Sequence, residues 1–225
     1  MAGHARPFPR MAPGRGGRGM TPQADRRATA VNSSTDPRIL GSITMNNVAV
    51  AIWQRPPVAD FLAWLEELAP ARLPRLRCRL PPAWVTEAVA HACDEAGTPP
   101  GLHRDMLVAD IAELARRAAD VTGAMMVDLR LDVSSGQPCP KWHLDAVSAR
   151  LLCTLRGAGT QFGPARPNGD PANIWQMRPG DVGMFRGRLW PGNGISGILH
   201  RSPPAGNGPE RLLVVIDPVD EAGSC

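Results

Sequence analysis

The sequence predicts an α+β fold in which helices pack on one face of an antiparallel barrel or sandwich. Two observations favour it: the segment 57–122 repeats apolar residues at helical spacing, and from Ala124 the chain divides into short runs bounded by turn residues. Helices followed by strands, rather than alternating with them, are typical of this class. The length of 225 residues and the 43% hydrophobic content fit one globular domain. We therefore expect a single domain over 46–219, with a barrel over 124–218.

The two ends of the chain are expected to lie outside this domain. Residues 1–45 repeat Gly, Pro and Arg without apolar periodicity, which predicts a disordered basic tail, and residues 220–225 are expected to form a flexible C-terminus. Seven arginines against two acids give residues 1–38 a charge of +5, so the net charge of +4 leaves about −1 for the rest. That balance argues against a nucleic-acid-binding body. A translation start at Met20 or Met45 is the alternative explanation of the tail.

Composition also restricts the compartment and the partners. No apolar run follows the N-terminal arginines, and none reaches the length of a membrane span, so neither a secretory signal nor a membrane partner is expected. The five cysteines are scattered and include no CxxC pair, which indicates a reducing compartment and hence a cytoplasmic location. The glycine-rich loops lack the patterns that bind nucleotides.

The first half of the domain is predicted to be mainly helical. A short strand is expected in the run VAVAIW, followed by a helix in PVADFLAWLEELAP, whose apolar residues follow the i, i+3, i+4, i+7 spacing. A second helix is expected in PPAWVTEAVAHACDEAG, with proline at its start and glycine at its end. The third, in GLHRDMLVADIAELARRAADVTG, has the apolar stripe Leu107, Ile111 and Leu114. Between the first two helices, ARLPRLRCRL is expected to be a solvated edge, with an anion-facing segment as the alternative.

The second half is predicted to be β-structure. Around residue 128 the chain alternates with period two, so that Val127 and Leu129 share one face while Asp128 and Arg130 share the other. Short strands separated by turn residues favour a barrel or a sandwich. The runs are AMMVDLRLDV, SARLLCTLRG, NIWQMRPG, DVGMFRG, ISGILH and RLLVVIDP.

The segment CPKWHLDAVSARLLCTLRG carries the candidate chemistry. Residues i and i+2 of an extended segment point to the same side, so His143 and Asp145 can present an imidazole and a carboxylate to one point. His200 is the only other histidine in the β-rich half. Two histidines and one carboxylate leave further coordination positions open, the arrangement used by non-haem iron(II) oxygenases. We therefore predict that these three residues bind a metal ion.

Other interpretations of the same segment stay open. His143 and Asp145 could be a polar pair that caps a turn, in which case the domain would be an interaction module without metal. Cys139, four residues before His143, could add a thiolate as a fourth ligand and close a tetrahedral zinc site. Such a zinc site would serve metal handling or structure without turnover.

The layout of HxD, a distal histidine and an arginine separated from it by ten residues resembles the iron(II)/2-oxoglutarate dioxygenases. This resemblance implies a cupin-like double-stranded β-helix (jelly roll) with the N-terminal helices packed on one sheet. It also implies that the three predicted ligands hold iron(II) and that Arg211 pairs with the distal carboxylate of 2-oxoglutarate. A guanidinium matches a carboxylate bidentately, so this role suits an arginine.

The sequence departs from that family at the co-substrate. Leu213 stands where many members have Ser or Thr, and the chain has no tyrosine. Thr154 is therefore expected to supply a hydroxyl to the co-substrate, with Thr160 and Ser202 as alternatives.

The substrate itself is not predicted, but two residues are candidates for its pocket. Arg150 shares a face with Thr154 on the run after Asp145, and Trp142 directly precedes His143. The expected partners are a small-molecule co-substrate and an unknown substrate.

Several longer motifs resemble one further family over most of Asn46 to Asp217. They are CPKWHLDAVSARLLCTLRGAGTQF, GDVGMFRG and HRSPP followed by RLLVVID, and they are similar to the bacterial family of unknown function DUF1826. This second resemblance implies one continuous domain and brings no activity with it.

Overall fold

The computed structural model describes residues 27–219 apart from 168, 193, 207 and 209. The parts of the expected tail and C-terminus at 1–26 and 220–225 lie outside the described residues.

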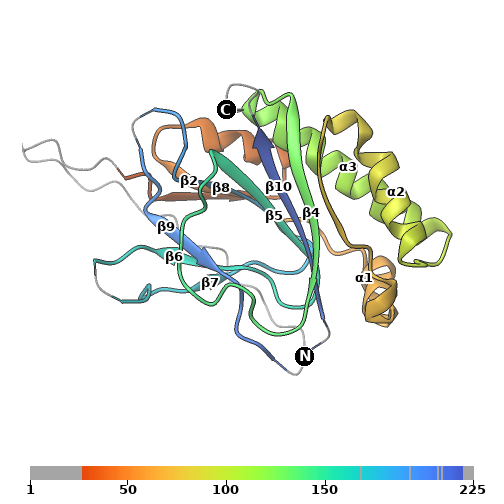
Figure 1. The fold of residues 1–225 in the computed structure, drawn as a ribbon. Helices are drawn as coiled ribbons and strands as arrows, with labels where there is room; N and C mark the ends of the chain where they lie inside the picture. The colour runs from red at the N-terminus through yellow and green to blue at the C-terminus, as the bar shows by residue number, and fades with distance from the viewer. Residues whose placement is uncertain (1–26, 168, 193, 207, 209, 220–225) are drawn as a thin grey trace, which may run out of the picture.

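Within the described part, ten strands form two β-sheets (Figure 1). The large sheet has the order β1-β2-β8-β5-β10-β4-β3, and only the β1–β2 pair is parallel. Its strands are β1 (Ala30–Ser34), β2 (Val48–Trp53), β3 (Leu76–Leu80), β4 (Met126–Ser134), β5 (Ala149–Arg156), β8 (Val182–Arg186) and β10 (Arg211–Val219). The small antiparallel sheet contains β7 (Trp175–Gln176), β6 (Gln161–Pro164) and β9 (Ile198–Arg201) in that order.

The helices follow the sequence patterns closely. The α-helices are α1 (Ala59–Glu67), α2 (Val85–Glu95) and α3 (Leu102–Thr122), and the 3-10 helices are η1 (Pro37–Thr44), η2 (Pro70–Arg72) and η3 (Pro82–Trp84). Helix α3 ends at Gly123, whose φ of 74° is the left-handed conformation that glycine adopts without strain. The predicted stripe of Leu107, Ile111 and Leu114 is fully buried.

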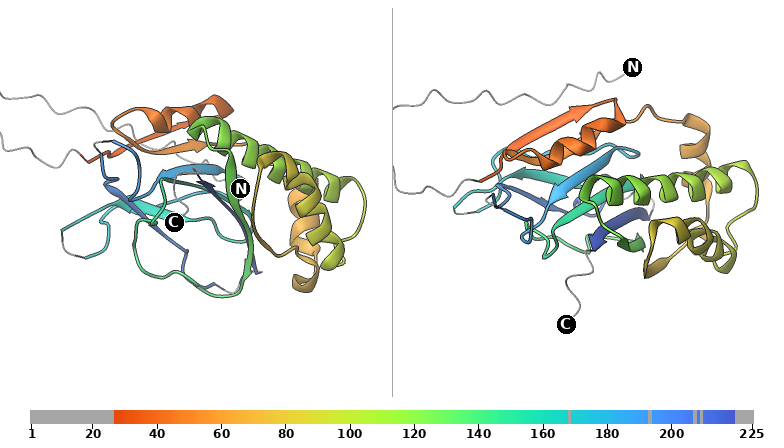
Figure 2. Two further views of the ribbon diagram at one scale, coloured as in Figure 1. Left: turned by 45° about the horizontal axis from the view of Figure 1, so that its top comes forward. Right: turned by 90° about the horizontal axis from the view of Figure 1, so that it is seen from above.

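The large sheet has an apolar layer on each side. Along β10, Leu212, Val214 and Ile216 belong to the core beneath the helices, whereas Leu213 and Val215 belong to a second core beneath the small sheet. Period-two alternation thus gives one strand two buried faces. Figures 1 and 2 show the helices on one side of the large sheet and β6, β7 and β9 on the other.

Two expected boundaries need correction. Residues 27–45, assigned to the tail, contain β1 and η1, and Leu40 and Ile43 of η1 are buried. The expected barrel over 124–218 also recruits β1, β2 and β3 from earlier in the chain, and the described strands form two facing sheets rather than a closed barrel. The physical reason is pairing between segments far apart in sequence, such as β2 with β8, which periodicity within one segment does not reveal.

The loop that leads into β5 is fixed by the segment after β8. Gly187 donates a backbone hydrogen bond to Ser148 O (2.8 Å), and Arg188 donates one to Asp145 O (2.8 Å). A Cβ at Gly187 would lie 1.9 Å from Val147 O, closer than any real contact. The closing glycine of GDVGMFRG is therefore required for the approach of the two segments, and it holds the backbone of Asp145 in place.

None of the helices in the described part of the chain is both long and apolar enough to cross a membrane.

Replacement of Gly187 tests this close approach. Gly187→Ala is expected to lower the free energy of unfolding by about 1–3 kcal/mol, because the added methyl group must displace the 145–148 backbone. Urea denaturation followed by circular dichroism measures the change. Gly41→Ala is the matched control, since nothing lies within 4 Å of a Cβ at Gly41. Equal stability of the two variants would contradict the packing described.

Candidate metal centre

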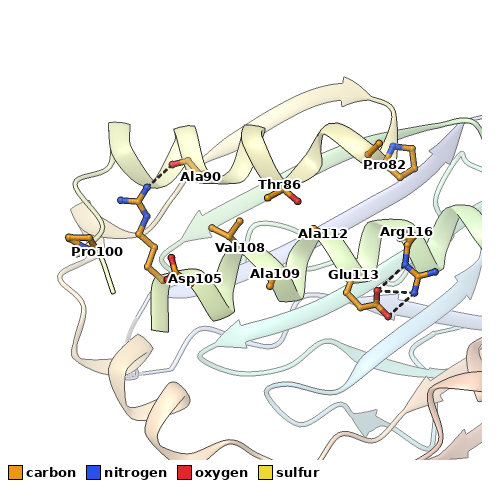
Figure 3. A pocket seen from close by; sticks show the side chains of 12 residues that line it. Pro82, Thr86, Ala90, Pro100, Asp105, Val108, Ala109, Ala112, Glu113 and Arg116 are labelled. Atoms are coloured by element: carbon orange, nitrogen blue, oxygen red, sulfur yellow. Dashed lines mark hydrogen bonds and ion pairs between the residues drawn. The ribbon is translucent and has the colours of Figure 1, made fainter. Parts of the chain in front are cut away.

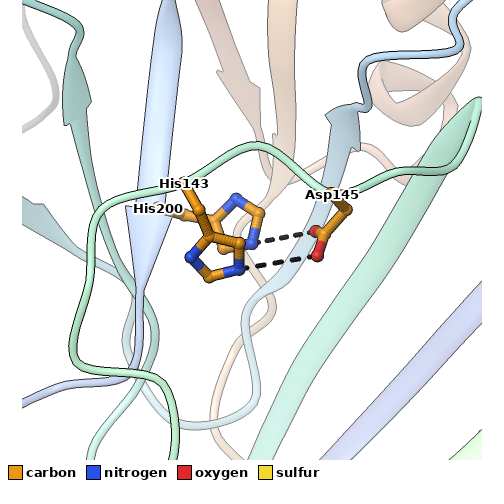
Figure 4. A group of neighbouring side chains, drawn as sticks. All are labelled: His143, Asp145 and His200. Atoms are coloured by element: carbon orange, nitrogen blue, oxygen red, sulfur yellow. Dashed lines mark ion pairs between the residues drawn. The ribbon is translucent and has the colours of Figure 1, made fainter.

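The structure brings His143, Asp145 and His200 together, and each offers one ligand atom within 4.8 Å of the others. The backbone arranges this meeting: His143 and His200 exchange two hydrogen bonds of 3.1 Å each, so they form an antiparallel bridge between the 141–144 segment and β9. Directly paired residues carry their side chains on the same face. Figure 4 shows both imidazole rings directed at the Asp145 carboxylate.

The two histidines approach different oxygens of Asp145. His200 Nε2 lies 2.9 Å from Oδ2, and His143 Nε2 lies 3.5 Å from Oδ1. Despite that short distance, Oδ2 is buried without a well-formed hydrogen bond to any described residue, and the same is true of His200 Nδ1. A buried carboxylate oxygen without a hydrogen bond is unfavourable unless a ligand satisfies it. The three side chains therefore suit a bound cation.

Burial and neighbouring charges shift the pKa values of the three groups in different directions. Burial raises the pKa of the Asp145 carboxyl. The interactions with His143, His200 and Arg150 outweigh the effect of burial, so the pKa lies below its ordinary value. Burial lowers the pKa of His200, whereas the interaction with Asp145 raises the pKa of His143. Asp145 is accordingly ionised and His200 neutral at neutral pH, the states that metal ligation requires.

Arg150 holds the Asp145 carboxylate from the other side. Its Nη1 donates to Asp145 Oδ1, while Nε and Nη2 each donate over 2.6 Å to the two oxygens of Asp217 on β10. Arg130 on β4 adds a hydrogen bond of 2.9 Å to Asp217. Arg150 is predicted to line the substrate pocket, but its guanidinium is occupied by two carboxylates rather than open to a substrate.

The sequence reasoning missed the roles of Asp217 and Arg130. Asp217 lies six residues after Arg211 on the same strand, so the alternation of β10 places both on one face. The even spacing of Arg211 and Asp217 is visible in the sequence, but the pairing of β10 with both β4 and β5 is not.

Arg211 lies at the start of β10 and is buried, with a relative exposure of 6%. Its Nη2 donates to Thr154 Oγ1 (2.9 Å) and to Thr160 Oγ1 (2.8 Å), and its Nε donates to Ala158 O (2.9 Å). It forms no ion pair with a carboxylate of the described residues, and burial lowers its pKa to about 10. Arg211 therefore remains charged at neutral pH, and no carboxylate of the described residues lies within ion-pair distance of its guanidinium, although the charge of Asp132 acts on it from further away.

Two further predicted residues take other positions. Trp142 lies beneath the Arg201 guanidinium, 4.4 Å from the ring centroid, which is the geometry of a cation–π contact. Cys139 is exposed, and its thiol is not among the ligand atoms that gather around Asp145. The described residues thus bring together the two histidines and the aspartate without the cysteine.

Three solved structures are similar to this chain over most of its length. The dioxygenase for auxin oxidation 1 from Arabidopsis thaliana, in its binary complex with 2-oxoglutarate, is 9% identical, with a TM-score of 0.47 over 84% of this chain and 92% of that one. The rice dioxygenase for auxin oxidation is 13% identical, with a TM-score of 0.48 over 85% and 83%. A full-length protein from Neurospora crassa in complex with alpha-KG is 13% identical, with a TM-score of 0.42 over 90% and 88%. At such low identities and TM-scores, nothing about this chain is concluded from these likenesses.

The comparison with curated proteins gives no match. A family model, described as a protein of unknown function, matches residues 34–217 and so covers the helices, the His143–Asp145–His200 cluster and both sheets except for most of β1 and the last two residues of β10. The chain belongs to this family, DUF1826.

Proposed function

We propose that this protein is an iron(II)- and 2-oxoglutarate-dependent oxygenase. The observation that carries the proposal is the meeting of His143, Asp145 and His200, whose ligand atoms all lie within 4.8 Å of one another around a buried carboxylate. Two imidazoles and one carboxylate occupy one side of an ion and leave positions for a co-substrate and O2.

The strand arrangement supports a double-stranded β-helix as the finer description of the fold. Strands β8, β5, β10 and β4 are neighbours in the large sheet, and they face β7, β6, β9 and the extended segment that His143 pairs with β9. Eight segments in two facing sheets are the arrangement of a jelly roll.

Arg211 and its threonines are proposed to bind the distal carboxylate of 2-oxoglutarate. A buried guanidinium that has no described carboxylate in direct contact is strongly stabilised by one from a ligand, and the planar fork fixes the orientation of that ligand. Thr154 is the cross-strand partner of Leu213, so its hydroxyl lies beside the position that carries Ser or Thr in many such oxygenases. The departure at Leu213 is thereby compensated from the neighbouring strand.

Each residue then has a defined task. When bound, iron(II) with 2-oxoglutarate and O2 supplies oxidation of a C–H bond, with release of succinate and carbon dioxide. His143, Asp145 and His200 would hold the ion, and Arg150 would keep the Asp145 carboxylate oriented. Phe185, whose ring centroid lies 5.2 Å from that of His200, excludes water on one side of the ligand.

Zinc binding without turnover is the alternative. A closed tetrahedral site would need a fourth protein ligand, and the exposed Cys139 does not join the cluster. The geometry therefore favours the open, three-ligand site.

Removal of either histidine tests the metal site. His143→Ala and His200→Ala are each expected to weaken metal binding by at least about a hundredfold, because only two ligands remain. Metal content after anaerobic loading with iron(II) provides the measurement, and release of succinate from 2-oxoglutarate in the presence of O2 tests turnover.

His91→Ala is the matched control, because the His91 side chain is 74% exposed and lies on α2, away from the site. Unchanged metal content in His143→Ala would refute the metal site altogether. Tight zinc binding by the wild type with no succinate release would refute only the oxygenase.

Replacement of Arg211 tests the co-substrate site separately. Arg211→Met should raise the KM for 2-oxoglutarate by about 10- to 100-fold, because hydrogen bonds to a charged group are lost. Iron content should stay unchanged, since Arg211 does not contact the metal ligands. Arg38→Met, at an arginine whose side chain is 89% exposed, serves as the control for loss of charge. An unaltered KM in Arg211→Met would contradict the assignment.

A further inference from the structure

A cavity of about 580 Å³ opens on the large sheet beside the candidate metal centre. It is lined by side chains of β3, β4, β5 and β10, and its volume is typical of a small-molecule site. The charged residues of its lining are Arg77, Arg79, Asp128, Arg130, Arg150 and Asp217.

The register of the sheet gathers these charges on one face. Arg77 on β3 is opposite Arg130 on β4, and Arg79 is opposite Asp128. Four arginines face two aspartates of the lining, and Arg150 is also paired with Asp145, so an excess of one positive charge remains. Such an excess in a concave site attracts anions.

Among the arginines of the cavity, Arg77 is the one without an ion-pair partner in the described part of the chain. Arg79 forms a bidentate pair with Asp128, with distances of 2.7 and 2.9 Å. Asp217 is shared by Arg130 and Arg150. Arg77 is exposed and forms no ion pair within the described part of the chain, and it lies directly across from Arg130. These two guanidinium groups are thus placed to bind one anion together.

The cavity is connected to the metal centre through a single residue. Arg150 lines the cavity, and the same guanidinium holds Asp145. Arg150 therefore links the cavity directly to the candidate metal ligand Asp145.

Two other hollows lie on the helix face of the sheet, away from the metal centre. One, of about 400 Å³, is bounded by α1, α3 and the segment that follows β2. The other, of about 1080 Å³, lies between α2 and α3, where alanines form much of the wall and Arg116 is paired with Glu113 (Figure 3). Of these three hollows in the described part of the chain, the arginine-lined cavity is the one that combines unbalanced charge with proximity to the site.

We infer that this cavity binds a carboxylate or phosphate group of the substrate, with Arg77 and Arg130 as the anchoring residues. The inference rests on the proposed function for the word substrate, but anion binding itself requires no metal. Guanidinium forks bind both oxyanions in bidentate geometry, so the two are distinguished by experiment. Arg77 thus takes the anion-binding role that was the alternative interpretation of the segment ARLPRLRCRL.

Calorimetric titration of the metal-free protein tests the inference with three probes. Phenyl phosphate and benzoate carry the two candidate anions on one ring, and benzamide is the neutral counterpart. The wild type should bind at least one of the anions and not benzamide. Arg77→Gln should weaken that binding about tenfold, the effect of losing one charge-assisted contact. Arg72→Gln removes the same charge from an exposed position outside the cavity and should leave binding unchanged.

Several results would overturn the inference. They are failure of the wild type to bind either anion, equal binding of benzamide, and binding that persists in Arg77→Gln but disappears in Arg211→Met. Circular dichroism confirms that each variant is folded. The protein could bind an anion through Arg77 and yet bind no iron and release no succinate. That outcome would refute the oxygenase proposal and support the anion site.

Discussion

The pairing of Arg150 with Asp145 and Asp217 is the interaction on which the candidate site depends. The side chains of the two aspartates are 8% and 7% exposed, so their charges are stable only with a partner. Loss of one member of a buried ion pair costs about 3–5 kcal/mol, because the remaining charge is uncompensated. The order of the large sheet meets this need, since it places β5 directly beside β10.

The three candidate metal ligands lie where the large and the small sheet meet. His200 belongs to β9 of the small sheet, and Phe162 of that sheet packs against Phe185 of the large one, with ring centroids 5.9 Å apart. The loop that carries Asp145 is fixed at Gly187 and reaches His200 through the backbone of His143. The site thus joins the two sheets, and its geometry depends on how closely they pack.

The sequence alone was sufficient for the helices and for the residues that meet at the site. Helical spacing identified the buried stripe of α3, and the HxD pattern with His200 identified a cluster that the structure brings within 4.8 Å. It was insufficient for β1, which lies in a segment rich in polar residues, because that strand is defined by its pairing with β2. It also left Arg150 open to a substrate, since the partners of Arg150 lie five and 67 residues away in sequence.

The position of β3 has a consequence beyond ligand binding. It is one of the two edge strands of the large sheet, and the edge of a sheet is where a strand from another molecule can pair. Charged side chains on an edge strand discourage such association, and Arg77 and Arg79 supply them at alternate positions. Two of the four arginines that line the cavity therefore also stand where they discourage association through that edge.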